Sequence, residues 1–156
     1  MRAACKNNIE VKANIMIGFP GEKKRDTLPN TLFFIKMAWV GVQDATCFPF
    51  SPYPGSELFQ QLIDKGCIKL DDDYLRSLFN YQPLTKTDSY SEYMSDRFVT
   101  YCTLFNMAVF YAFSLLFRPV RAWHLFNNLI IHKKPVSRLE TAIFRLMQRN
   151  KQKLPD

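Results

Sequence analysis

The residues best suited to chemistry in this chain lie in a turn with the sequence Ile-Gly-Phe-Pro-Gly-Glu at positions 17–22. A glycine has no Cβ, so Gly18 and Gly21 can adopt positive φ angles and let a ligand approach the backbone closely. An apolar run precedes the turn and a helical pattern follows it, which is typical of a buried parallel strand ending at the carboxyl edge of a sheet. Two interpretations are open, a ligand-binding loop and a purely structural turn.

A second segment of the same kind occupies residues 48–58, Phe-Pro-Phe-Ser-Pro-Tyr-Pro-Gly-Ser-Glu-Leu. Its three prolines make a rigid loop, because each proline fixes its own φ and constrains the residue before it. Both segments follow apolar runs that we interpret as consecutive parallel strands. We therefore expect the two loops to lie side by side.

Cysteine and histidine spacing argues against a metal site. No CxxC pair occurs, and the two histidines, His124 and His132, have no carboxylate beside them. The amino terminus carries no signal-peptide pattern, so we expect reduced and mostly buried cysteines in a cytoplasmic protein. The four cysteines are Cys5, Cys47, Cys67 and Cys102.

Composition indicates a globular chain that favours anionic partners. Of its 156 residues, 47% are hydrophobic and 22% are charged, and the formal net charge is +7. We expect no nucleic-acid partner, because no RNA-recognition or zinc-finger pattern accompanies the charge. Basic residues crowd the last quarter of the chain, at Lys133, Lys134, Arg138, Arg145, Arg149, Lys151 and Lys153.

The first half of the chain predicts a strand, a helix and a second strand, which together form a right-handed βαβ unit. The strands are expected at residues 10–17 and 42–48, and Asp26 is expected to cap the intervening helix, which Gly41 ends. A short helix over residues 58–65 is expected after the second loop. The apolar face of the long helix is predicted to comprise Leu28, Leu32, Ile35 and Trp39.

Residues 70–91 are polar and are predicted to be irregular. The run Asp71-Asp72-Asp73 within them favours a solvated turn or a helix amino terminus over a metal site.

No charged residue occurs in residues 98–117, which Arg97 and Arg118 bracket. This stretch fits a membrane span, a helix in the headgroup region, or a buried helix packed on the α/β part. Pro119 is expected to break the helix, which resumes over residues 120–131. A last amphipathic helix is expected from Ser137, either binding an anionic surface or packing on the protein.

The loops at 17–22 and 48–58, in this order and at this spacing, resemble the last two strand–loop units of radical S-adenosylmethionine (radical SAM) enzymes. These enzymes commonly show a GxPGET turn followed by a PYPGTEL-like loop. The similarity is greatest to the cobalamin-binding branch that includes the anaerobic magnesium-protoporphyrin monomethyl ester cyclase. Residues 113–121 resemble the FYLRP helix junction of that branch. The likeness covers residues 11–65 closely and 71–130 loosely.

The resemblance implies an α/β fold, a partial (β/α) barrel formed by residues 1–69 and followed by a helical extension, residues 70–156. It implies a [4Fe–4S] cluster, S-adenosylmethionine and in this branch cobalamin, with a radical that attacks a small-molecule substrate. No catalytic residue and no metal ligand is assigned. The resemblance places Tyr53 and Gly55 at the substrate pocket and assigns contacts with S-adenosylmethionine to Gly18, Phe19, Pro20, Gly21, Glu22, Phe48 and Phe50.

The sequence departs from the family in one decisive respect, because the cluster-binding motif CxxxCxxC is absent. Only fourteen residues precede Ile15, which leaves no room for earlier strands. Lys23 also stands where the family has threonine. We therefore expect the carboxyl-terminal portion of a radical SAM enzyme, inactive alone, whose partner is the amino-terminal half of the barrel.

Two other classes of function remain open. One is a non-catalytic module that contacts a membrane or a protein through its helical tail, which rests on the uncharged stretch at 98–117. The other is an α/β domain that binds an anion at the helix after Gly21, aided by Lys23, Lys24 and Arg25.

Overall fold

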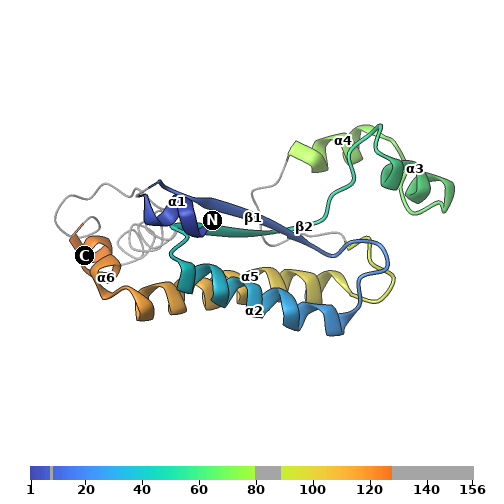
Figure 1. Cartoon of the computed structure of the whole chain (residues 1–156). Coiled ribbons are helices and arrows are strands. Elements are labelled where there is room, and N and C mark those ends of the chain that lie inside the picture. Colours follow the sequence, from blue (N-terminus) through green and yellow to red (C-terminus); the bar gives the residue numbers. More distant parts are fainter. Residues whose placement is uncertain (8, 80–88, 128–156) are drawn as a thin grey trace, which may run out of the picture. The chain divides into compact units, whose positions relative to one another are not determined.

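The computed structural model describes residues 1–7, 9–79 and 89–127 (Figure 1). The elements in chain order are α1 (Arg2–Lys6), β1 (Lys12–Ile17), the 3-10 helix η1 (Lys24–Asp26), α2 (Thr27–Val40), β2 (Asp44–Pro49), α3 (Glu57–Asp64), α4 (Asp72–Phe79), α5 (Asp96–Phe117) and α6 (Pro119–Phe126). The expected strand–helix–strand order is present. The predicted helix from Ser137 lies outside the described residues, as does the end of the helix predicted over 120–131.

Strands β1 and β2 form a two-stranded parallel sheet in the described part of the chain, with α2 as the crossover between them. At one end the N–H groups of Gln43 and Asp44 donate to the carbonyl oxygen of Val11, at 3.0 and 3.4 Å. At the other end the N–H of Phe50 donates to the carbonyl oxygen of Ile17 at 2.7 Å. This is a βαβ unit, and its place in a larger barrel stays a prediction.

The prediction that β1 is buried on both faces was wrong. Lys12, Asn14 and Met16 are exposed, whereas Ile17 on the other face is buried. The apolar run at residues 15–17 suggested burial because periodicity cannot show whether anything covers the second face of a strand.

The chain divides into two compact units that interleave along the sequence. Unit 1 comprises Met1–Ala13, Thr31–Thr46 and Met107–Asp156, and unit 2 comprises Asn14–Asn30 and Cys47–Asn106. The four long elements β1, α2, β2 and α5 therefore each begin in one unit and end in the other. The domain boundary expected at residue 70 stays a prediction.

The core of unit 1 forms between α2, β2 and α5. Phe34 and Phe110 are fully buried, and their ring centroids lie 6.5 Å apart in an edge-to-face arrangement. Asp44 is also buried, and its carboxylate accepts a hydrogen bond from the Tyr111 hydroxyl at 2.5 Å. A buried carboxylate is costly unless it has such a donor, so Tyr111 stabilises the start of β2.

The buried face of α2 differs from the prediction. Leu28, Leu32 and Trp39 are 64%, 57% and 64% exposed, and Ile35 is half-buried. The buried positions are instead Phe34, Met37 and Ala38. Apolar residues occur all around α2, so their period does not select one face, and the choice is made by packing.

Two sets of hydrogen bonds cap the carboxyl end of α2. Val42 donates its N–H to the carbonyl oxygen of Met37 at 3.1 Å and Gly41 donates to that of Ala38 at 3.2 Å, the Schellman pattern. Arg121 then donates to the carbonyl oxygens of Gly41 and Val42, at 2.9 and 2.8 Å. Gly41 ends the helix as expected, whereas the hydrogen bonds from Arg121 to this end were not predicted.

The core of unit 2 is an apolar cluster of Phe50, Phe59, Leu62 and Ile68, against which Tyr74 and Tyr90 pack. Helix α3 enters it as predicted, and its first turn is capped by the Ser56 hydroxyl, which accepts from the Phe59 N–H at 3.2 Å.

The prediction of an irregular segment was wrong over Asp72–Phe79, which forms α4. The Asp71 carboxylate accepts from the N–H of Tyr74 at 2.8 Å, so the acidic run begins a helix, which is one of the two structures that were favoured over a metal site.

Helix α5 covers the uncharged stretch, and α6 begins at Pro119 after a single-residue break at Arg118. Among the described residues, α5 is the one helix long and apolar enough to cross a membrane, with a mean hydropathy of 1.5. A core helix of a soluble protein can have the same length and composition.

Candidate functional site

The two predicted loops meet in unit 2, where β1 and β2 end. The rings of Phe19 and Phe50, one from each loop, lie with their centroids 4.4 Å apart at an interplanar angle of 32°. The hydrogen bond from Phe50 to Ile17 fixes this register. The expectation that the loops lie side by side is confirmed, and the binding roles given to their residues stay a prediction.

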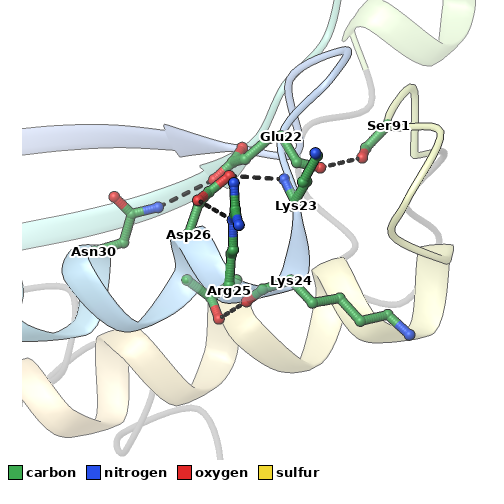
Figure 2. Close-up of polar contacts among 8 residues, drawn as sticks. Glu22, Lys23, Lys24, Arg25, Asp26, Asn30 and Ser91 are labelled. Carbon is green, nitrogen blue, oxygen red and sulfur yellow. Dashed lines mark hydrogen bonds and ion pairs between the residues drawn. The ribbon is translucent and has the colours of Figure 1, made fainter.

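Glu22 organises the first loop from inside. One oxygen of its carboxylate accepts the N–H groups of Gly18 and Phe19, at 2.6 and 3.1 Å. The other oxygen accepts from the side-chain amide of Asn30 at 3.1 Å, and the Glu22 carbonyl accepts from the Ser91 hydroxyl at 2.7 Å (Figure 2). Sequence reasoning missed Asn30 and Ser91, because a polar side chain in a helix or loop carries no signal of such a distant partner.

These bonds determine what the loop can offer to a ligand. The N–H groups of Gly18 and Phe19 are occupied by Glu22, so they are not available as donors. The loop presents instead the half-buried ring of Phe19, with Pro20 also half-buried beside it. Its chemistry is therefore that of an apolar wall on a rigid turn.

The two glycines of the loop serve different purposes. Both have positive φ, 87° at Gly18 and 80° at Gly21, where a side chain would be strained. A Cβ at Gly18 would lie 3.4 Å from the side chain of Val99, whereas at Gly21 it would meet nothing within 4 Å. Gly18 thus permits the close approach of α5, and Gly21 permits the turn itself.

The basic run after the loop is held by local contacts. The N–H of Lys23 donates to the Asp26 carboxylate at 2.9 Å (Figure 2). Asp26 is therefore the last residue of η1, whose cap is Lys23, and it does not have the predicted role of capping the long helix from the position before its first turn. The ammonium groups of Lys23 and Lys24 lie 5.3 and 5.4 Å from the ring centroids of Tyr93 and Phe98. Each lysine therefore faces an aromatic ring, the geometry of a cation–π contact.

The second loop combines a buried base with an exposed tip. Phe50 is buried and Phe48 half-buried, whereas Tyr53 is 55% exposed and Gly55 is exposed. Tyr90 packs edge-on against Phe50 with centroids 6.3 Å apart, and the Tyr74 hydroxyl donates to the carbonyl of the buried Pro52. Tyr90 and Tyr74 were not predicted, since residues 70–91 were expected to be irregular.

Unit 2 also contains two buried cysteines, Cys47 and Cys102. Burial raises the pKa of the Cys47 thiol to about 12, although the nearby polar side chains of Thr103 and Asn106 act in the opposite direction. Burial, together with the charge of Glu22, also raises the pKa of the Cys102 thiol. Both cysteines are therefore neutral thiols near pH 7, which are poor nucleophiles and poor ligands.

The described residues hold no group of three or more His, Cys, Asp or Glu side chains that could bind a metal ion. A [4Fe–4S] cluster takes a set of cysteine thiolate ligands, and the described cysteines do not gather into such a set. The half-buried ring of Phe19 offers an apolar surface, and it packs against the ring of the buried Phe50.

Comparisons with protein-family models, with curated proteins and with solved structures return no match.

Proposed function

We propose that this chain is the carboxyl-terminal part of a radical SAM enzyme and contributes one wall of the pocket for S-adenosylmethionine and substrate. The observation that carries the proposal is the meeting of Phe19 and Phe50 from two loops at the same end of a parallel sheet. Ligands of open α/β sheets bind at this end of the strands. The proposal names S-adenosylmethionine as the ligand because the two loop motifs, in this order, resemble those of radical SAM enzymes.

In this proposal each loop has a defined part. Phe19 contacts the cofactor, the buried Phe50 supports the Phe19 ring from the second loop, and Phe48 at the end of β2 belongs to the same apolar wall. Glu22 holds the turn rigid by accepting its N–H groups. Tyr53 and Gly55, at the exposed end of the second loop, face the substrate.

The cluster and its reactive chemistry belong to another part of the enzyme. In the intact family the cluster reduces S-adenosylmethionine to give a 5′-deoxyadenosyl radical. Within the described residues no set of thiolates fits the cluster, so we assign no reaction step to this chain.

Equilibrium dialysis with S-adenosylmethionine tests the wall directly. We expect weak binding that Phe19→Ala reduces several-fold. The matched control Tyr101→Ala removes an exposed aromatic ring of the same unit outside the loops and should leave binding unchanged. Equal effects of the two substitutions would refute the assignment. Anaerobic incubation with iron and sulfide should give no cluster absorbance, and a bound cluster would overturn the view that this chain lacks one.

A second candidate is a non-catalytic membrane-associated or protein-binding helical module. It is favoured by the composition of α5, whose mean hydropathy is 1.5. This candidate predicts no binding of S-adenosylmethionine, so the same dialysis experiment separates it from the first.

A further inference from the structure

The polarity of α5 is reversed with respect to an ordinary surface helix. Its buried positions include three polar residues, Thr103, Asn106 and Ser114. Its exposed positions from the second turn to the end carry no charge, although a solvated face normally carries charged side chains. This exposed stripe consists of Tyr101, Leu104, Phe105, Ala108, Ala112 and Leu116.

A group of large apolar side chains surrounds the junction between α5 and α6 in unit 1. Trp39, Leu116, Val120 and Trp123, which we call the junction patch, are 64%, 70%, 64% and 65% exposed. Trp39 packs edge-on against Phe117 with ring centroids 4.9 Å apart, which places it at the junction. Surface residues of this size are usually scattered, and a gathered set marks an interaction site.

The junction is rigid as well as apolar. The Arg121 guanidinium donates to the carbonyl oxygens of Gly41 and Val42 and to the Ser114 hydroxyl, the last at 2.6 Å. These bonds connect α5, α6 and the carboxyl end of α2. The junction patch is therefore presented by a fixed framework, which lowers the entropy lost on binding.

The charge around this surface has a single sign. Exposed Arg97 and Arg118 bracket the uncharged stretch, and no acidic residue occurs from position 97 to 127. The sequence beyond adds the seven basic residues named above, against Glu140 and Asp156. A positive apolar surface is complementary to an anionic one and is repelled by a second copy of itself.

We propose that the junction patch, together with the unit 1 part of the exposed stripe (Ala108, Ala112 and Leu116), docks on the surface of an anionic lipid bilayer, with this end of α5 lying in the headgroup region. Tryptophan prefers this region, and basic side chains add attraction to acidic lipids. The other face of this part of α5 packs on protein through Phe110, so the helix enters one leaflet and does not cross the bilayer. This proposal is independent of the proposed enzyme function.

Trp39 and Trp123 make the test direct, because they are the two tryptophans of the chain and both belong to the junction patch. We expect their fluorescence to shift to shorter wavelength when vesicles of phosphatidylcholine with phosphatidylglycerol are added. Vesicles of phosphatidylcholine alone should give a much smaller shift. Added salt should weaken the binding, because part of the attraction is electrostatic.

Substitutions in the junction patch test whether vesicle binding depends on this surface. The double substitution Leu116→Asp with Val120→Asp should weaken vesicle binding by at least about tenfold, since it places two negative charges in the patch. Leu70→Asp is the matched control, because Leu70 is 57% exposed in unit 2 and belongs to neither the stripe nor the patch. Trp123→Ala, read by flotation with the same vesicles, provides an uncharged variant if the double variant does not fold.

The proposal is overturned if the wild-type chain does not bind the acidic vesicles, or if the patch variants and Leu70→Asp behave alike. It is also overturned if light scattering without lipid shows a dimer that the patch variants dissociate, because the surface would then join two copies of the chain.

Discussion

At the scale of single residues, Glu22 has a structural role that the sequence motif did not predict. The resemblance places Glu22 among the residues that contact the cofactor, whereas the carboxylate lies within hydrogen-bond distance of Gly18, Phe19 and Asn30. Such charge-assisted bonds are stronger than those between neutral groups. Glu22 is therefore a positioning residue for the loop.

Substitution of Glu22 should destabilise the protein measurably. We expect Glu22→Ala to lower the free energy of unfolding by about 1–3 kcal/mol, because it leaves the loop N–H groups without their acceptor. Glu22→Gln should cost less, since its amide oxygen can still accept. Urea denaturation provides the measurement. Glu92→Gln, which removes one partner of an exposed ion pair with Lys65, serves as the control and should change stability by less than about 1 kcal/mol.

The thiol of Cys47 makes a second residue-scale prediction, which concerns pH. Its pKa rises from 9.0 to about 12 on folding, so between these values the unfolded chain ionises and the folded chain does not. Stability should therefore be unaffected by this group below pH 9 and should fall above it, by up to about 1.4 kcal/mol per pH unit.

Denaturation curves from pH 8 to 11 would measure this dependence, and Cys47→Ala should make it shallower. Cys67 is exposed, so Cys67→Ala is the control and should leave the slope as it is. An identical slope in the wild type and in Cys47→Ala would show that burial of this thiol does not govern the response.

At the scale of elements, the sequence predicted the strands β1 and β2, the crossover α2 and the short helix α3 to within a few residues. The end of α2 was predictable because Gly41 readily adopts the positive φ that a residue just after a helix often needs. The predicted face of α2 failed because apolar residues surround that helix. Helix α4 was missed because its polar residues obscured the apolar positions that pack on the loops.

The candidate site was predictable only where its parts lie within one motif. Phe19 and Phe50 were both named from the sequence, because each belongs to a recognisable Gly/Pro loop. Asn30 was not, although its partner Glu22 lies only eight residues away. Ser91 and Tyr90 were not either, since their contacts join segments distant in the sequence. No local pattern encodes such long-range partners, which only the packed structure brings together.

Arg121 gives the element-scale prediction. Arg121→Ala should lower the free energy of unfolding by about 2 kcal/mol, because two carbonyl oxygens at the end of α2 and the Ser114 hydroxyl lose a charged donor. Arg121→Lys should recover only part of this, since an ammonium cannot reproduce the planar fork of a guanidinium.

Thermal unfolding followed by circular dichroism would measure both variants. Arg118→Ala is the matched control, because exposed Arg118 makes one hydrogen bond within the described part of the chain, of 3.3 Å to the Val40 carbonyl. Its loss should cost less than about 1 kcal/mol. A larger effect at Arg118 than at Arg121 would contradict this account of how α2 ends.

At the scale of the whole molecule, the structure describes a βαβ unit whose two loops meet and whose strand β1 has one exposed face. Part of a larger parallel sheet would have these properties, because further strands and helices would cover that face. The enzyme proposal therefore predicts that the chain supplies a wall of the cofactor pocket and that the remaining walls lie on its partner.

The most direct test is a titration of the nitrogen-15-labelled chain with S-adenosylmethionine, followed residue by residue by NMR. We predict chemical-shift changes confined to Gly18–Glu22 and Phe48–Gly55. Because the pocket is incomplete, the dissociation constant should be about 1 mM. ATP serves as the control, and shifts at Lys23 to Arg25 with ATP alone would favour the anion-binding alternative. Absence of shifts in both loops at millimolar S-adenosylmethionine would contradict the account.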